Sequence, residues 1–324
     1  MADAAIGLLR EQLVRRRTRL VAGIDQSNSA VELRSLLSEV DAALDRMARG
    51  TFGLCDTCRD PIEPERLLAD PLVRFCLDHL TRAQQTRLER DLELAVQIQR
   101  GLLPANPFLT GLWTMAFEYR PAHLVSGDYC DVVPATNSDW YFLLGDVAGK
   151  GVAASMLMTQ LHAMFRALVP GGLSLPDLVG RASTIFCEST LPMHYATLVC
   201  LRAQADGAVE ICSAGHLPPV LVRDRRATRL DAGGLPLGMF CSFDYTTTTI
   251  TMGAGDALVL YSDGLSETEN SGGEEFGLDG IAEACAASAG SPPDVIVAEC
   301  LAEIDRFRSG PQADDVTMMV IVRR

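Results

Sequence analysis

Four short acidic motifs in the C-terminal two thirds of the chain place aspartates where apolar segments begin or end. They are Asp128 in SGDYCD, Asp146 in GDVAGKG, Asp263 in YSDG and the pair Asp314 and Asp315 in ADDVT. Carboxylates at strand edges are costly to bury unpaired, and several that converge repel one another unless cations neutralise them. Oxygen-only sites suit Mg²⁺ or Mn²⁺, and two such ions can activate water for attack on phosphorus. The pattern indicates phosphoryl chemistry at a two-metal site.

Each of these motifs taken alone has a simpler interpretation. A single Asp-Gly is typical of a turn. The glycine-rich GDVAGKG also resembles a phosphate-binding loop, but it lacks the GxxxxGK[ST] spacing, since Gly151 follows Lys150. The ordered set of four motifs therefore favours the metal site over a nucleotide-binding loop.

A second cluster has the spacing of metal ligands. Cys55 and Cys58 are separated by two residues, and so are Cys76 and His79 further along the chain. Zinc prefers four tetrahedral thiolate and imidazole ligands, which two such turns can present. A redox cysteine pair is the alternative, but it leaves the second pair unexplained. We predict one structural zinc ion with its shell filled by these four residues.

Charge and composition limit the classes of function. The 324 residues include 28 basic and 42 acidic side chains, for a net charge of −14. Residues 1–100 carry 15 Arg and 16 Asp/Glu (net −1), which leaves 13 basic and 26 acidic side chains (net −13) for residues 101–324. This acidity disfavours nucleic acid and anionic membranes as partners.

The compartment is inferred from apolar runs and cysteines. We find no run of about 18 apolar residues and no signal-peptide pattern, so we expect a cytoplasmic protein without a membrane span. In such a chain the ten cysteines are expected to be reduced or metal-bound. Those outside the finger, including Cys130, are predicted to be reduced.

The surrounding elements divide the chain into four parts. Apolar stripes predict a helical hairpin over 1–50, with its turn at 25–29, then the finger over 51–80 and a linker helix over 81–104. Over 105–324 short β-type runs alternate with helices expected near 152–168, 175–190, 278–289 and 293–307. The strands are predicted at 115–119, 129–134, 140–144, 196–202, 209–213, 220–222, 245–252, 257–261 and 316–322. This order predicts an α+β domain of antiparallel sheets with helices outside them.

The ordered motifs resemble a known family. LAVQIQRGLLP, YRPA, SGDYCD, GDVAGKGVAASMLM, SAGHLPP, GLPLG, YSDGLSE and ADDVT are similar to the RsbU/SpoIIE branch of the PPM metal-dependent serine/threonine phosphatases, over roughly residues 85–324. The resemblance implies an αββα sandwich and a dinuclear Mn²⁺/Mg²⁺ site. It implies hydrolysis of phosphoserine or phosphothreonine on a small protein, an anti-sigma-factor antagonist of the STAS type.

The resemblance also implies roles for individual residues. Asp146 would bridge the two metals, assisted by the Val147 carbonyl, and Asp128 would complete one metal's shell. Asp263 and Asp314 would bind the other metal, with Asp315 as the less favoured alternative to Asp314, and a metal-bound water would be the nucleophile. Arg120 and Lys150 are candidates for steadying phosphate, but we expect them to be solvated charges. We expect His216 to be a structural turn histidine rather than a general acid.

The finger resembles a second family. GTFGLCDTC, Ile62, Arg66, Leu67, Pro71 and CLDH are similar to the DksA/TraR zinc fingers, which also follow a helical hairpin. That family usually has a fourth cysteine where this chain has His79. Its members reach RNA polymerase through acidic residues at the hairpin tip, where this chain offers only Asp25. Binding to the polymerase is therefore disfavoured.

The linker helix gains a role from the first resemblance. In that family an equivalent segment joins a sensory module to the phosphatase, and its pairing switches activity. A stripe through Leu88 and Leu102 leads to the hypothesis of a homodimer in which the hairpin and finger regulate the enzyme. Docking of the stripe on the chain's own sandwich is the alternative.

Two other functions compete with protein phosphatase activity. One is a non-catalytic zinc-finger transcription modulator that uses the phosphatase fold as a binding platform, but such a domain is expected to lose its metal-site carboxylates. The other is hydrolysis of a small phosphorylated metabolite, which the linker helix disfavours.

Overall fold

The computed structural model describes residues 3–24, 30–80, 82–136, 138–191, 193–231 and 233–324. The chain forms two compact units, Met1–Asp91 and Leu92–Arg324. One helix, α4 (Arg82–Leu102), begins in the first unit and ends in the second.

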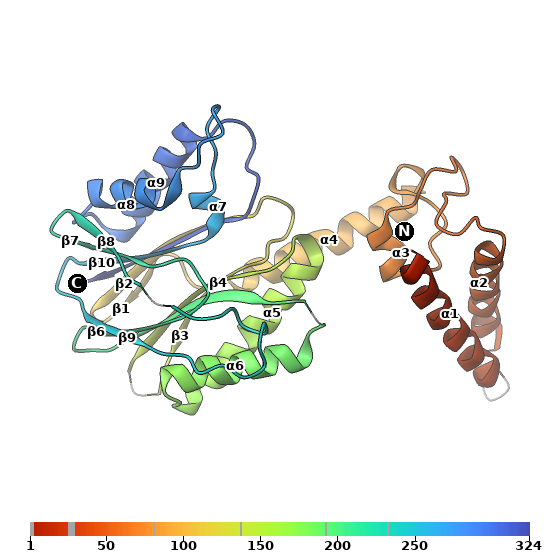
Figure 1. The fold of residues 1–324 in the computed structure, drawn as a ribbon, viewed down its shortest axis with the longest axis horizontal. Helices are drawn as coiled ribbons and strands as arrows, with labels where there is room; N and C mark the ends of the chain where they lie inside the picture. The colour runs from red at the N-terminus through yellow and green to blue at the C-terminus, as the bar shows by residue number, and fades with distance from the viewer. Residues whose placement is uncertain (1–2, 25–29, 81, 137, 192, 232) are drawn as a thin grey trace. The chain divides into compact units, whose positions relative to one another are not determined.

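The first unit starts with the expected pair of helices, α1 (Asp3–Ile24) and α2 (Ala30–Ala48) (Figure 1). Leu13 and Leu20 of α1 pack against Val40 and Ala43 of α2. The predicted turn at 25–29, including Asp25, lies outside the described residues. The finger follows with a short helix, α3 (Pro64–Ala69), and a 3-10 turn, η1 (Leu77–His79).

The second unit is a sandwich of two antiparallel sheets. Over its described residues one sheet has six strands in the order β1-β2-β11-β10-β7-β8, and the other has five in the order β3-β4-β5-β6-β9. The bounds are β1 (Phe108–Thr110), β2 (Trp113–Arg120), β3 (Asp128–Pro134), β4 (Trp140–Val147), β5 (Ala196–Ala203), β6 (Ala208–Ala214), β7 (Val220–Arg223), β8 (Arg226–Arg229), β9 (Thr248–Thr251), β10 (Ala257–Tyr261) and β11 (Val316–Arg323).

Helices cover the outer faces of both sheets (Figure 1). The five-stranded sheet is covered by α5 (Gly151–Leu168) and α6 (Leu175–Ser189), and the six-stranded sheet by α8 (Gly277–Ala287) and α9 (Pro293–Phe307). A short helix, α7 (Asp263–Ser266), follows β10. The αββα sandwich is therefore confirmed.

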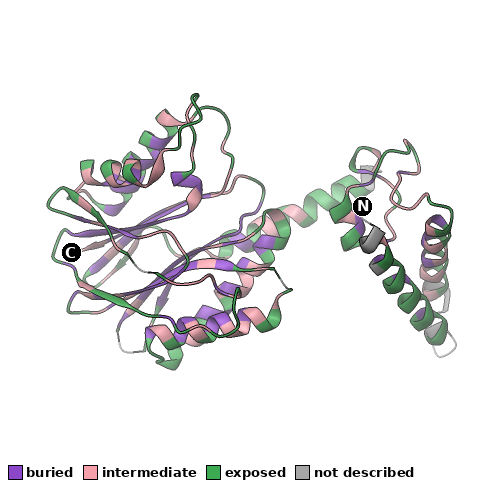
Figure 2. Cartoon of the chain, in the orientation of Figure 1, coloured by how far each residue is buried: buried purple, intermediate pink, exposed green. Residues whose placement is uncertain are grey.

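Alternation along the strands produces three apolar layers. Phe142 and Leu144 of β4 lie in the layer between the sheets, whereas Leu143 packs under α5 and α6. Successive side chains of a strand point to opposite faces, so a strand covered on both sides is apolar throughout. Figure 2 shows these buried strands, with the exposed residues of the helices facing outward.

The differences from the expected strands lie at the sheet edges. The edge strands β1 and β8 were not predicted, and β9 is shorter than the predicted 245–252. β8 consists of Arg-Ala-Thr-Arg, mostly exposed, and therefore lacks the apolar alternation of a half-buried strand. Tyr245 lies before β9 and outside any strand. Its side chain is nevertheless buried, and its hydroxyl donates to the Leu235 carbonyl at 3.0 Å.

One helical stretch bears on the expectation that the chain has no membrane span. Within the described ranges, residues Gly151–Gly171 form one helical stretch whose length and composition would allow it to cross a membrane, with a mean hydropathy of 1.3. Leu161 and Phe165 of this stretch are fully buried in the layer beneath the five-stranded sheet. A helix that packs into the core of a sandwich must also be apolar, so this stretch is weak evidence for a membrane span.

The expectation that all cysteines outside the finger are reduced was wrong. Cys187 of α6 and Cys241, in the loop before β9, form a disulfide with their Cα atoms 5.3 Å apart. The Thr184 hydroxyl donates to the Cys241 carbonyl at 3.1 Å and ties the same loop to α6. A pair separated by 54 residues leaves no local sequence signal. Cys130 is free and buried, as expected.

Candidate functional sites

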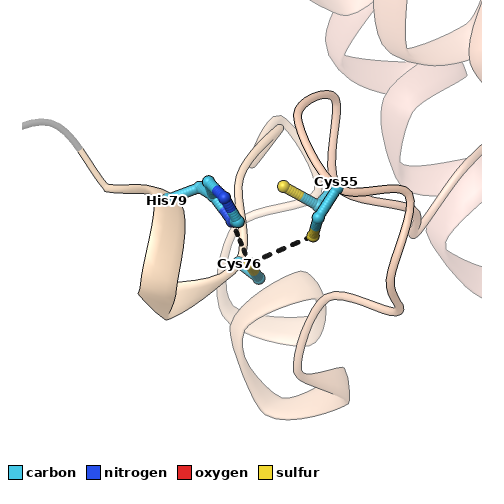
Figure 3. A group of neighbouring side chains, drawn as sticks. Cys55, Cys76 and His79 are labelled. Carbon is cyan, nitrogen blue, oxygen red and sulfur yellow. Dashed lines mark hydrogen bonds between the residues drawn. The ribbon is translucent and has the colours of Figure 1, made fainter.

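The finger brings its four predicted ligands together. The ligand atoms of Cys55, Cys58, Cys76 and His79 all lie within 4.8 Å of one another. The Cys76 sulfur lies 3.8 Å from that of Cys58 and 3.2 Å from His79 Nδ1. Figure 3 shows Cys55, Cys76 and His79 directed toward a common centre. This geometry fits a tetrahedral zinc ion.

Backbone turns create that centre. The Cys55 amide donates to the Asp60 carbonyl at 2.8 Å, and the Arg59 amide donates back to the Cys55 carbonyl at 2.9 Å. On the other side, the His79 amide donates to the Cys76 carbonyl at 3.1 Å. Each two-residue spacing is therefore closed into a turn that presents both of its ligands on one side.

The sulfurs of the finger compete for protons. Desolvation opposes ionisation of Cys55, but amide groups of Cys58, Cys76 and Thr57 directed at its sulfur lower its pKa to about 6. The Asp60 amide lowers the pKa of Cys58, but desolvation and neighbouring side chains, including those of Cys55 and Cys76, outweigh it and raise that pKa to about 12. A divalent cation binds such a group by displacing its protons.

The second site lies at one end of the sandwich. Asp128 opens β3 directly opposite Asp146 near the end of the antiparallel strand β4. Asp263 follows β10, and Asp314 precedes β11, which pairs with β10. The topology thus brings both sheets' acidic motifs to the same end.

Burial and mutual repulsion raise the proton affinity of these carboxyls. Burial, then the charges of Asp263, Asp314 and Asp315, raises the pKa of Asp146 to about 7. Burial and the charge of Asp146 hold the pKa of Asp128 well above its usual range, although the Thr317 hydroxyl donates to it at 2.5 Å. This donor set, acidic and poor in cations, fits hard divalent ions.

The two adjacent aspartates before β11 have different environments. Asp315 accepts the Ala122 amide at 2.7 Å on one carboxylate oxygen and the Gly127 amide at 3.0 Å on the other. Asp314 is partly exposed and pairs with Lys150 at 2.9 Å. The Asp315 carboxylate therefore holds the loop before β3, while the charges of both Asp314 and Asp315 raise the pKa of Asp146.

Two glycines allow close approach at this end. A Cβ on Gly127 would lie 3.0 Å from the Val147 carbonyl oxygen and 3.3 Å from Asp146 Oδ1. A Cβ on Gly264 would lie 2.1 Å from the Asp315 carbonyl oxygen. The glycine of the SDG motif is therefore required for packing between these segments, and that of the SGD motif lies in a tight contact.

His216 connects the two sheets beside these carboxylates. Its Nε2 lies 3.1 Å from the Tyr261 carbonyl, so it donates, and its Nδ1 then accepts the Thr197 hydroxyl at 2.8 Å. Burial lowers the pKa of His216 to about 4, against the weaker effect of the Tyr261 carbonyl. A neutral ring with both nitrogens engaged is a structural link.

Other charged groups at this end are already paired. Arg120 contacts Asp305 at 2.9 Å and Glu118 at 3.1 Å.

Over the described residues, the finger quartet is the one group of three or more His, Cys, Asp or Glu close enough to share a single ion. The carboxylates of the sandwich raise one another's pKa values, but among the described residues no three of them lie close enough to share one ion.

Sequence reasoning missed several supporting residues. Thr317, Thr197 and Gln99 carry no metal-ligand signature, and each makes its contact with a segment distant in sequence. Two of them had an available signal, because Thr317 is the last residue of the ADDVT motif and Gln99 lies within LAVQIQRGLLP.

The fold belongs to the class of PP2C-type phosphatase domains. The SiaA-PP2C domain of Pseudomonas aeruginosa superimposes with a TM-score of 0.64 at 18% identity, over 75% of this chain and all of that one.

Within that class, the chain belongs to the SpoIIE family. The family model "Stage II sporulation protein E (SpoIIE)" matches residues 136–324. The model "Prokaryotic dksA/traR C4-type zinc finger" matches residues 50–78, ending one residue before His79.

The relatives from Bacillus subtilis include two phosphoserine phosphatases. Phosphoserine phosphatase RsbP is 27% identical over 57% of this chain and 47% of RsbP. Phosphoserine phosphatase RsbU is 25% identical over 76% of this chain and 74% of RsbU. The chain thus spans about half the length of RsbP.

The finger quartet generates a first prediction. Cys76→Ser should abolish tight zinc binding because one ligand of four is lost, whereas His79→Cys should retain zinc because it restores a four-cysteine set. The exposed substitution Asp78→Asn is the control. Zinc per chain is measured by elemental analysis after dialysis against a weak chelator. Full zinc retention by Cys76→Ser would contradict the ligand set.

His216 generates a second prediction. Because its pKa is lower in the folded chain than in the unfolded one, its contribution is present above about pH 6.5 and is lost as the pH falls toward 4. The cost is on the order of 2 kcal/mol. The unfolding free energy, measured by urea titration from pH 7 to pH 4.5, should fall less for His216→Asn than for wild type.

The exposed His123 supplies the control. His123→Asn should keep the wild-type slope, and comparison among the three proteins cancels the titration of the aspartates. Equal slopes for all three would show that His216 is not held neutral.

Proposed function

We propose that the chain is a metal-dependent protein serine/threonine phosphatase. The observation that carries the proposal is the convergence of four acidic motifs from both sheets on one end, where burial and repulsion raise the pKa of Asp146 to about 7. Family membership and relatives named phosphoserine phosphatases support the same reaction.

The site is proposed to hold two Mn²⁺ or Mg²⁺ ions. Asp146, assisted by the Val147 carbonyl, would serve both ions, with Asp128 on one, and Asp263 and Asp314 on the other. We assign Asp315 to loop anchoring, because two backbone amides already occupy its carboxylate. When bound, the ions would neutralise the phosphate and activate water for attack on phosphorus.

The chain's own residues shape the approach to this site. A cavity of about 320 Å³ lies beside Asp314, and its lining includes Lys150, Glu267 and Gln312. The Gln312 amide donates to the Asp314 carbonyl at 2.7 Å and fixes that part of the wall. We propose that the phosphorylated segment enters here, where Lys150 keeps Asp314 oriented.

The proposed substrate is phosphoserine or phosphothreonine on a regulatory protein, an anti-sigma-factor antagonist of the STAS type. The two Bacillus relatives are named phosphoserine phosphatases, which supports phosphoserine as the group that is hydrolysed. We place the reaction in the cytoplasm, where the three finger cysteines would stay reduced and one zinc ion would stabilise the finger.

A non-catalytic transcription modulator is the second candidate, favoured by the finger's match to the DksA/TraR model. Each of the four acidic motifs of this chain contains its aspartate, which supports catalysis instead.

Asp146→Asn tests the proposed reaction. The variant should fold, bind Mn²⁺ more weakly and lose turnover by orders of magnitude, because the shared carboxylate is replaced by a neutral amide. The assay is Mn²⁺-dependent phosphate release from a phosphorylated STAS protein, with calorimetry for Mn²⁺ binding. Asp279→Asn, an exposed acidic position, is the control. Full activity of Asp146→Asn would refute the two-metal assignment.

We also propose that α4 pairs two copies of the chain. Of its predicted stripe, Leu88 and Ile98 are exposed, at 41% and 54%, and the neighbouring Leu94 is 55% exposed. Leu102 instead packs against the core of the chain's own sandwich. The exposed members support pairing with a second copy, through which the hairpin and finger would regulate the enzyme.

Ile98→Glu tests this pairing. A charge on the exposed stripe should convert a dimer to a monomer, because burying it in an apolar helix interface is costly. Light scattering at micromolar concentration measures the mass, with Gln97→Glu as the control of equal charge. A monomeric wild type with α4 intact would contradict the proposal.

A further inference from the structure

A buried glutamine of α4 makes two hydrogen bonds with one residue of the acidic end. Gln99 is 4% exposed, and its Nε2 donates to the Ser126 carbonyl at 2.7 Å. The Ser126 amide in turn donates to Gln99 Oε1 at 3.0 Å. The side-chain amide thus satisfies both backbone groups of a fully buried residue, as a neighbouring strand would.

The residue held in this way begins the segment that carries Asp128. The Ser126 hydroxyl accepts the Asp128 amide at 2.9 Å. The next residue, Gly127, accepts the Val147 amide at 3.3 Å and donates to the Asp315 carboxylate at 3.0 Å. The three consecutive residues therefore contact the chain on both sides of the acidic end.

We infer that Gln99 is a positioning residue for the cation site, which fixes the 126–128 segment and couples it to α4. This inference rests on the proposed function and adds a residue that touches neither substrate nor metal. Loss of the two Gln99–Ser126 hydrogen bonds would shift Asp128 relative to Asp146 and alter the approach of Gly127 to the Val147 carbonyl. Residues that orient ligands in this way typically change metal affinity by about 10- to 100-fold.

The C-terminal end of α4 also contacts α5. The pair of Gln99–Ser126 hydrogen bonds therefore lies next to a fixed end of the helix. His162 of α5 hydrogen-bonds the backbone of Leu102, and its Nε2 lies 3.6 Å from the buried Asp131 carboxylate. Arg166 binds the same carboxylate at 2.6 Å. A rotation or shift of α4 would therefore act on Ser126 through Gln99 while the helix end stays anchored.

Two substitutions separate positioning from simple packing. Gln99→Glu keeps the shape and the acceptor for the Ser126 amide, but it sets a carboxylate oxygen against the Ser126 carbonyl. Gln99→Met keeps the length and removes both hydrogen bonds. The exposed neighbour Gln97, as Gln97→Met, is the matched control.

The experiment measures Mn²⁺ binding to the full chain by calorimetry, in variants whose circular dichroism matches wild type. Both Gln99 variants should bind Mn²⁺ at least about tenfold more weakly, and saturating Mn²⁺ should restore most of kcat, whereas the control behaves as wild type. Mn²⁺ affinity within twofold of wild type in a folded Gln99 variant would overturn the inference.

A measurement on the wild type alone keeps the inference testable if the variants do not fold. Because coupling is reciprocal, Mn²⁺ should slow hydrogen exchange at the Ser126 amide. Unchanged exchange there on saturation with Mn²⁺ would overturn the inference. If the wild type binds Mn²⁺ but releases no phosphate, the proposed function fails while these affinities and exchange rates still decide the role of Gln99.

Discussion

Repulsion among carboxylates at one end of the sandwich is the constraint on which the second unit depends. Asp128, Asp146 and Asp263 come from elements of both sheets, and all three have raised pKa values because burial and neighbouring acids oppose their ionisation. Such an end is stable only if the framework around it tolerates that cost or if cations offset it. The apolar layers beneath supply the framework, and the donor set suits the cations.

Links between the two sheets keep the acidic motifs in place. His216 connects β5 with β10, Thr317 of β11 reaches Asp128 of β3, and Asp315 holds the loop before β3. Each link spans a long sequence separation, so the site exists only after the sandwich has formed. The finger differs, because its ligands lie within a few turns and its centre is built from local backbone hydrogen bonds.

The contrast between local and distant contacts explains what could be predicted from sequence. The helices, the sandwich and the finger quartet follow periodicity, spacing and motif order, which are local signals. The edge strand β8 and the Cys187–Cys241 disulfide did not, because each depends on which surfaces meet in the fold. For the same reason, motifs located the acidic end, but the two amides that Asp315 accepts, from Ala122 and Gly127, could not be predicted from the sequence.

The groups that support the acidic end are mostly neutral, and this has a physical reason. Gln99, Thr317 and the neutral His216 donate or accept hydrogen bonds without adding charge, whereas the lysine at this end, Lys150, pairs with the partly exposed Asp314. A buried arginine or lysine in their place would set a positive charge beside the carboxylates and weaken the field that would attract divalent ions. The neutral side chains of Gln99, Thr317 and His216 leave that field unchanged. They position the segments that carry the carboxylates, and the aspartates alone supply the negative charge.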